Sequence, residues 1–223
     1  MTDLALAGRV VVWGHSQGGN SALWTGIIAA RYAPDVNVAG VAALAPATDL
    51  GSLVATAKAS TFGKIVSAFL VHAYAARYPD VRSEDYLAGR ALPVVRDIVS
   101  RCVGGWETLL SALETTLLPS DGIFLRDPRD GPLSERLRES TPRQPIPMPL
   151  LLAQGDRDDL VSPAVQLSFV KERCATGQKI DYQVYPGLDH LSLVGAGSPL
   201  ERALVLWTQD RFAGKPAASS CPT

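Results

Sequence analysis

The hydrophobic residues of this chain gather into short continuous runs that are separated by longer segments of helical pattern. Most runs show no alternation of hydrophobic and polar positions, which is typical of strands buried on both faces of a parallel sheet. The predicted strands are 9–13, 36–45, 149–154 and 180–185, and the predicted helices are 17–32, 163–175 and 199–211. The last strand does alternate, which indicates a position nearer the sheet edge. Because parallel strands are joined by crossovers, the pattern predicts an α/β fold: a parallel sheet of about four strands with helices on both faces.

The pattern changes between residues 50 and 147, where no strand pattern survives. Helical patterns recur at 61–76, 94–103 and 106–118, separated by loops rich in proline, glycine and charge, and a proline-rich stretch leads back to the sheet. We therefore expect a helical insertion within the sheet domain. The expected organisation is a core at 1–49 and 148–213, an inserted helical cap or lid at 50–147, and a disordered tail at 214–223.

The first predicted strand runs directly into Gly14-His15-Ser16-Gln17-Gly18, and the first predicted helix follows at once. This is the G-x-S-x-G pattern of a nucleophile elbow in its strand–turn–helix setting. A strained turn lifts the serine hydroxyl clear of the sheet, and a side chain at the flanking glycines is expected to collide with the neighbouring strand or helix. The alternative is a glycine-rich turn of another doubly wound protein, including a phosphate-binding one. The spacings G-x-G-x-x-G and G-x-x-x-x-G-K-[ST] are absent, which favours Ser16 as a nucleophile.

Composition limits the partners that this chain can bind. The formal net charge is −1, so neither a nucleic-acid footprint nor a polybasic membrane patch is indicated. The mean hydropathy of +0.10 is that of a globular chain, and no run approaches the roughly eighteen apolar residues of a membrane span. The first residues show no basic region followed by an apolar stretch, so no signal peptide is visible.

The cysteines give no sign of a metal site. Cys102, Cys174 and Cys221 have no metal-ligand spacing, and their odd number argues against a complete disulfide framework. A Cys102–Cys174 pair in an oxidising compartment is one alternative, and unpaired thiols are favoured over it.

A serine nucleophile needs a base within hydrogen-bond reach, and the chain offers three histidines. His15 lies inside the elbow, where we expect its side chain to point away from that of Ser16. His72 falls in an apolar helical segment, where a buried or lid-facing histidine is the simpler interpretation. His190 follows the last predicted strand, at the sheet edge where the carboxyl ends of parallel strands converge and active sites form. Both elimination and position therefore favour His190.

The acid that orients this base should come from a loop between the two in chain order. The segment Gly155-Asp156-Arg157-Asp158-Asp159 follows the third strand and offers three candidates, of which we choose Asp158. Asp156 and Asp159 are then expected to structure the loop or to be solvated. Asp49 is an alternative acid after the second strand, and Asp189 is expected at the surface.

Three segments together resemble the α/β-hydrolase fold: Gly14-His-Ser-Gln-Gly-Gly19, Gly155-Asp-Arg-Asp158 and Gly187-Leu-Asp-His190. The stretches 12–22 and 33–43 with the long helical insertion resemble the secretory lipase family, and this likeness spans most of residues 8–212. It implies a catalytic triad of Ser16, Asp158 and His190, an ester or lipid substrate, a helical cap over an acyl pocket, and no cofactor or metal.

The chemistry that the resemblance implies is acyl transfer. His190 removes the proton of Ser16 as the hydroxyl attacks the ester carbonyl, Asp158 fixes the imidazole tautomer, and backbone N–H groups, one of them that of Gln17, meet the oxyanion. Apolar residues of the cap would suit an acyl chain, or equally a packed helical subdomain: Phe62, Phe69, Tyr74, Trp106, Leu109 and Leu110.

The chain departs from this pattern in what precedes the elbow. In this fold the elbow normally follows the fifth of eight strands, whereas here the first strand begins at residue 9. We therefore expect the C-terminal portion of a lipase. Its oxyanion hole is expected to be incomplete, because the second donor comes from the loop after the third strand of the complete fold, which precedes the elbow. Strand 9–13 would then form an uncovered apolar edge.

Two other functions stay open: another serine hydrolase, either a peptidase or an acyltransferase, and a non-catalytic fragment that needs an N-terminal partner chain. The family resemblance suggests secretion, whereas this chain carries no visible export signal.

Overall fold

The computed structural model describes residues 8–103, 105–120 and 122–221. The chain divides into two compact units, one drawn from 1–48 and 142–223 and the other from 49–141. We call them the sheet unit and the helical unit and describe each by itself.

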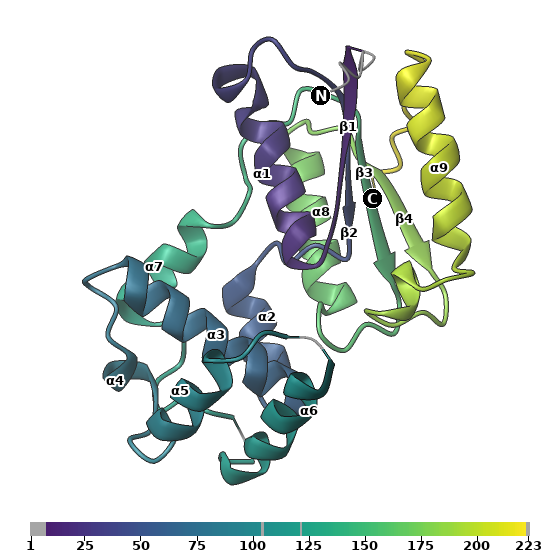
Figure 1. The fold of residues 1–223 in the computed structure, drawn as a ribbon. Coiled ribbons are helices and arrows are strands. Elements are labelled where there is room, and N and C mark those ends of the chain that lie inside the picture. Colours follow the sequence, from purple (N-terminus) through teal and green to yellow (C-terminus); the bar gives the residue numbers. More distant parts are fainter. Residues whose placement is uncertain (1–7, 104, 121, 222–223) are drawn as a thin grey trace, which may run out of the picture. The chain divides into compact units, whose positions relative to one another are not determined.

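The sheet unit is built from parallel strands and the helices that connect them (Figure 1). Its elements are β1 (Arg9–His15), α1 (Gln17–Tyr32), β2 (Asn37–Leu44), β3 (Leu150–Gly155), α8 (Pro163–Ala175), β4 (Asp181–Tyr185), the 3-10 turn η2 (Ser192–Val194) and α9 (Pro199–Phe212). The strands form one parallel sheet in the order β1-β2-β3-β4. The predicted α/β architecture with a four-stranded parallel sheet is confirmed.

Helices cover both faces of this sheet. One hydrophobic core lies between the sheet and helices α1 and α8, and the other lies between the opposite face and α9 (Figure 1). Buried side chains of the two cores include Leu23, Val41, Leu152 and Val170 on the first face and Leu44, Leu151, Leu200 and Trp207 on the second. Every residue of β3 is buried because this strand lies inside the sheet with both faces covered, which explains its continuous apolar sequence.

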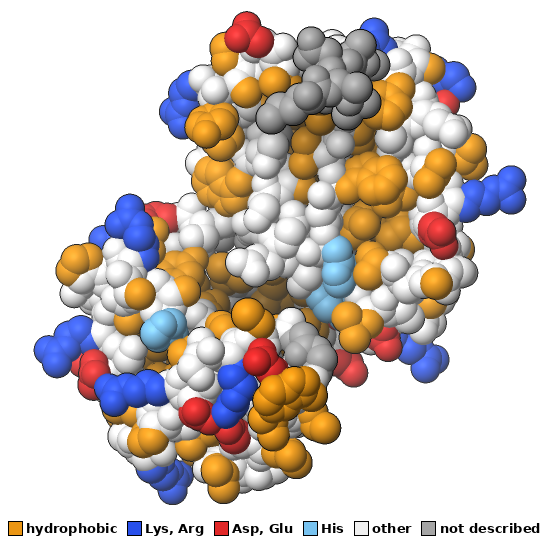
Figure 2. Space-filling view, in the orientation of Figure 1, with side chains coloured by type: hydrophobic (Ala, Val, Ile, Leu, Met, Phe, Trp, Pro, Cys, Tyr) orange, Lys and Arg blue, Asp and Glu red, His pale blue; other side chains and the backbone are white. Residues whose placement is uncertain are grey.

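Strand β1 forms one edge of the sheet. Among the described residues it pairs with β2 alone, and it has no buried residue, unlike the other three strands. The side chains of Val10 and Trp13 are 42 % and 47 % exposed. Figure 2 shows several hydrophobic side chains on the visible face of the sheet unit. An apolar strand at an open edge is a template for pairing with a further strand.

The helical unit has its own core. Its elements are α2 (Leu50–Ala57), α3 (Thr61–Arg77), α4 (Ser83–Tyr86), α5 (Leu92–Val99), α6 (Gly105–Glu114), the 3-10 turn η1 (Thr115–Leu117) and α7 (Gly131–Glu139). Fully buried residues of this core include Ile65, Val71, Tyr86, Ile98 and Leu133. One antiparallel bridge, between Leu87 and Phe124, lies in the stretch where we expected no strand pairing.

Three helices of this unit were not predicted, and each is short: α2, α4 and α7. Helix α2 begins after Asp49, whose carboxylate accepts a hydrogen bond from the N–H of Ser52, an N-cap signal in the sequence. Helix α5 ends at Val99 rather than at 103.

The C-terminal segment differs from the disordered tail that we expected. The N–H of Ser220 donates to the carbonyl of Ile180, and the Ser220 hydroxyl binds the backbone of Tyr182, so the segment lies along the start of β4. Cys221 forms a disulfide with Cys174, whereas Cys102 is free and exposed. The alternative Cys102–Cys174 pair is therefore wrong, and the favoured expectation of unpaired thiols is wrong for Cys174 and Cys221 and holds for Cys102 alone. Small residues without hydrophobic periodicity carry no signal for this backbone pairing. Residues 222–223 of the expected tail lie outside the described residues.

Candidate active site

Ser16 lies at the turn between β1 and α1 in a conformation that non-glycine residues rarely adopt. Its φ is 57° and its ψ is −120°. The N–H of Ser16 donates to the carbonyl of Leu44, and its own carbonyl accepts from the N–H of Ala47, at 2.9 and 3.1 Å. The last residue of β2 and the loop after it therefore bind both backbone groups of the serine.

Two glycines around the serine are required by close contacts, and one is not. A Cβ at Gly14 would lie 1.9 Å from the carbonyl oxygen of Gly18, and a Cβ at Gly19 would lie 2.8 Å from the Cβ of Pro46. A Cβ at Gly18 would meet nothing within 4 Å outside its own helix. The expectation that both flanking glycines avoid a collision is therefore right for Gly14 and wrong for Gly18.

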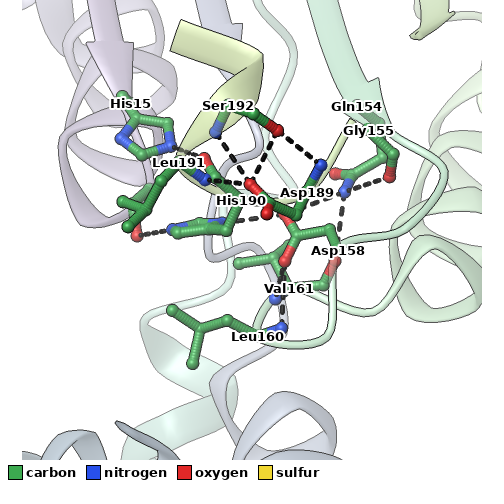
Figure 3. A network of polar contacts seen from close by, with 11 residues as sticks. His15, Gln154, Gly155, Asp158, Leu160, Val161, Asp189, His190, Leu191 and Ser192 are labelled. Carbon is green, nitrogen blue, oxygen red and sulfur yellow. Dashed lines mark hydrogen bonds and ion pairs between the residues drawn. The ribbon is translucent and has the colours of Figure 1, made fainter. Parts of the chain in front are cut away.

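His190 lies between Ser16 and Asp158 and contacts both. Its Nε2 is 2.8 Å from Oγ of Ser16, and its Nδ1 is 2.8 Å from Oδ2 of Asp158. Figure 3 shows the ring of His190 with the carboxylate of Asp158 at one of its nitrogens. The structure thus brings together the three predicted site residues, which come from the elbow, the loop after β3 and the loop after β4.

The carboxylate of Asp158 is buried, and hydrogen bonds hold both of its oxygens. Oδ1 accepts from the N–H groups of Leu160 and Val161, at 3.0 and 2.7 Å. Oδ2 accepts from Nε2 of Gln154 at 3.1 Å, beside its contact with His190. A buried carboxylate is costly unless donors surround it in this way. The loop therefore presents the carboxylate in one orientation.

Gln154 is a further residue of this candidate site, and the sequence patterns do not single it out. It is fully buried in β3, and besides Asp158 its amide contacts the carbonyls of Gly155 and Val161. Its amide therefore contacts both ends of the loop that carries Asp158, at Gly155 and at Val161. The available signal was an amide side chain within an otherwise apolar strand.

The loop after β3, which carries Asp158, and the loop after β4, which carries His190, are joined directly. A Cβ at Gly155 would lie 2.3 Å from the carbonyl oxygen of Leu188, and the N–H of Arg157 donates to the same oxygen at 3.0 Å. Asp156 accepts from the N–H of Gly187 at 2.6 Å, so it structures the loops, as expected. Asp159 is exposed.

Asp189 fixes the backbone that follows the base. Its Oδ1 accepts from the N–H groups of Leu191 and Ser192 and from the hydroxyl of Ser192 (Figure 3). The hydrogen bonds from Ser192 lower the pKa of the Asp189 carboxyl below its ordinary value. Asp49, the alternative acid, caps α2.

The other two histidines have different surroundings. Nε2 of His15 lies 2.9 Å from the carbonyl oxygen of His190, and the two rings lie 4.5 Å apart between centroids (Figure 3). Burial, and then the neighbouring His190, lower the pKa of His15. His72 is exposed on α3, so the expectation that it is buried is wrong.

The predicted oxyanion donor and the predicted apolar cap residues stay predictions. Gln17 is the first residue of α1, so its N–H belongs to a helix N-terminus, where backbone donors are free to meet negative charge. Within the helical unit, Phe69 and Tyr74 pack against its core, whereas Trp106 and Leu109 are 70 % and 63 % exposed.

The described residues offer no cluster of three or more histidine, cysteine, aspartate or glutamate side chains that could hold a metal ion. Helices long and apolar enough to cross a membrane are likewise absent from the described part of the chain.

Comparison with known sequences points to one family. The profile of the secretory lipase family matches residues 1–220. A probable inactive lipase of Mycobacterium tuberculosis is 24 % identical over 226 residues, which cover 96 % of this chain and 47 % of that protein. Lipase 5 of Candida albicans is 24 % identical over 232 residues, covering 99 % and 49 %. The chain thus spans about half the length of the curated relatives that it matches.

Solved structures show the same fold. Candida antarctica lipase A superposes with a TM-score of 0.75 at 21 % identity, over 96 % of this chain and 51 % of the lipase. A variant of the rice cell wall degrading esterase LipA from Xanthomonas oryzae gives a TM-score of 0.71 at 15 % identity, over 92 % and 58 %.

Proposed function

Because the chain belongs to the secretory lipase family, we propose that it is a serine ester hydrolase of the lipase or carboxylesterase type, with Ser16 as nucleophile, His190 as base and Asp158 as orienting acid. One observation carries this proposal: His190 has its two ring nitrogens 2.8 Å from Ser16 Oγ and 2.8 Å from Asp158 Oδ2. A base held between a hydroxyl and a buried carboxylate is the arrangement that activates a serine.

In the proposed mechanism, the two ring nitrogens of His190 have different roles in proton transfer. Asp158 accepts the hydrogen bond of Nδ1–H, which leaves the Nε2 lone pair of neutral His190 to take the proton of Ser16. The Ser16 oxygen then bonds to the ester carbonyl carbon, and the alcohol leaves with the proton that His190 returns. A water molecule, deprotonated by the same nitrogen, then bonds to the acyl carbon. The bond between that carbon and Ser16 Oγ breaks, His190 returns the proton to Ser16, and the acid leaves.

The negative charge that develops on the carbonyl oxygen needs donors. The N–H of Gln17 at the start of α1 supplies one of them in this proposal, assisted by the positive end of the helix dipole. Loss of one oxyanion donor costs about 10²–10³ in rate. A chain with Gln17 as its single donor would therefore be slow yet still form an acyl-enzyme.

The family implies an ester substrate, either a lipid or an ester of a smaller acid. The names of the relatives do not decide whether the chain is active, because one is called a lipase and another a probable inactive lipase. The ester proposal is separated from a peptidase or acyltransferase by a panel of p-nitrophenyl esters of increasing acyl length beside peptide anilides.

The first test is labelling of the 223-residue chain with a fluorophosphonate probe, which bonds to an activated serine. Labelling of the wild type, lost in Ser16→Ala and His190→Ala and reduced in Asp158→Asn, is the expected result. Ser168→Ala is the matched control, because this exposed α8 hydroxyl donates to the carbonyl of Ala164, one turn earlier in its own helix. A folded wild-type chain that does not label contradicts activity of the chain alone.

A second candidate is a fragment that works only beside a partner chain. The open edge of β1, with Val10 and Trp13 exposed, favours this candidate. A folded, unlabelled chain that gains labelling at Ser16 when it is co-expressed with the product of an adjacent upstream reading frame would support it. Labelling of the purified chain alone would exclude the need for a partner.

A further inference from the structure

We propose that His15 is a positioning residue whose Nε2–H donates a hydrogen bond to the carbonyl oxygen of His190 and so holds the backbone of the base against the elbow. The inference rests on the proposed function, because His190 must be the base for its placement to matter in the reaction. It assigns a role to the residue that directly precedes the nucleophile.

Two consecutive residues of the elbow contact opposite ends of His190. Ser16 Oγ lies 2.8 Å from Nε2 of the ring. His15 Nε2 lies 2.9 Å from the backbone carbonyl oxygen, and Figure 3 shows His15 beside His190. Consecutive side chains of a regular strand point to opposite faces, so both could not reach one residue. The turn at Ser16, with φ 57°, makes it possible.

The other contacts of the base loop hold the residues on either side of His190. The carbonyl of Leu188 accepts from the N–H of Arg157, and the carboxylate of Asp189 accepts from Leu191 and Ser192. The hydrogen bond from His15 acts on His190 itself. It therefore fixes the distance between the base and the serine more directly than its neighbours do.

The protonation state of His15 fits this role. A carbonyl oxygen can only accept, so the Nε2 that contacts it carries the proton. Burial and the neighbouring His190 lower the pKa of His15, and they outweigh the hydrogen bond to the His190 backbone and the smaller attraction of Asp158, both of which raise it, so the ring is neutral at neutral pH. His190 and Asp158 are the titratable groups that act on this ring. A neutral ring 4.5 Å away does not repel the imidazolium that forms at His190.

The kinetic test compares two substitutions at this position. His15→Leu removes the donor, and we expect kcat for a p-nitrophenyl ester to fall about tenfold with little change in KM, since the loss of one neutral hydrogen bond corresponds to about that factor. His15→Gln keeps an N–H at a similar reach and should recover most of the loss. His72→Gln, on the exposed helix α3, is the matched control and should behave as wild type.

Two kinetic results would overturn the proposal. One is a wild-type kcat in His15→Leu. The other is an equal loss in His15→Leu and His15→Gln, with all variants melting at the wild-type temperature. A merely structural role would lower the melting temperature and leave the kcat of the folded fraction unchanged.

A second measurement does not depend on activity. With three histidines in the chain, long-range ¹H–¹⁵N NMR spectra can be assigned by the His72→Gln and His15→Gln variants. We expect the Nε2–H tautomer for His15. Both substitutions remove a ring that lies 4.5 Å from the ring of His190, so the hydrogen bond is read from the difference between them: the His190 resonances should shift or broaden more in His15→Leu than in His15→Gln. An Nδ1–H tautomer at His15, or equal changes at His190 in the two variants, refutes the contact. An inert wild-type chain with the expected spectra would instead count against the proposed function alone.

Discussion

The glycines of the elbow allow a paired test in which one motif position is fragile and another is not. We expect Gly14→Ala to disrupt the turn and Gly18→Ala to be tolerated, although both glycines belong to the same G-x-S-x-G pattern. Neither backbone is in the left-handed region, so the difference lies in the space available to a Cβ.

The magnitude follows from the contacts. A Cβ at Gly14 would lie 1.9 Å from the Gly18 oxygen, whereas real Cβ contacts stay above 3.0 Å, so the first turn of α1 must move by about 1.1 Å (3.0 − 1.9). Overlap with backbone rather than with a flexible side chain places the cost at roughly 3–5 kcal/mol. A shift of about 1 Å at the nucleophile also costs about 10² in rate. Gly18→Ala should gain about 0.5–1 kcal/mol from helix propensity.

Thermal unfolding and fluorophosphonate labelling measure both effects on the same samples. A change of about 1 kcal/mol shifts the melting temperature of a chain of this size by roughly 2–4 °C, so Gly14→Ala should melt on the order of 10 °C lower and Gly18→Ala slightly higher. Equal melting temperatures for the two variants, or a Gly14→Ala chain that labels at the wild-type rate, would refute the steric reasoning.

Two further predictions concern stability. Cys221→Ser removes a disulfide between residues 47 positions apart and should lower the free energy of unfolding by about 2–4 kcal/mol. A reductant should lower the free energy of unfolding of the wild type by the same amount and leave that of the variant unchanged. Cys102→Ser is the control and should behave as wild type. Burial raises the pKa of Asp181, so the folded state holds that proton more tightly and stability falls as pH rises from the unfolded value through the folded one. Asp181→Asn should therefore stabilise the protein more at pH 7 than at pH 3 in urea unfolding, whereas equal gains, or the same pattern in the exposed control Asp35→Asn, would contradict this.

The sequence predicts best those parts of the fold in which the pattern of hydrophobic residues is clear. The strands at 149–154 and 180–185 are correct to within a residue, because β3 is buried on both faces and β4 lies at an edge. Their carboxyl ends meet at one edge of the sheet, so chain order alone suggested which loops lie near Ser16. The structure brings Asp158 and His190 to hydrogen-bond distance of one another for this reason.

Contacts between backbone groups distant in the sequence could not be predicted in the same way. The pairing of Ser220 with β4, and with it the Cys174–Cys221 disulfide, depends on where the chain runs after α9. No hydrophobic period marks that path. Helix α7 was missed because its sequence is mostly polar and charged, with Leu133 and Leu137 as its buried apolar positions.

The alternation rule itself explains why the role of His15 was not anticipated. Applied to the strand, it sends the side chains of His15 and Ser16 to opposite sides, and the rule is valid up to His15, the last residue of β1. At Ser16 the backbone leaves the extended region, so the serine hydroxyl returns toward the edge that His15 already faces. The strain that exposes the nucleophile thus also brings its neighbour to the carbonyl of the base. Sequence periodicity therefore fails at the residue where the local conformation serves the site, and a polar residue directly before such a turn should be examined for a contact with the base loop.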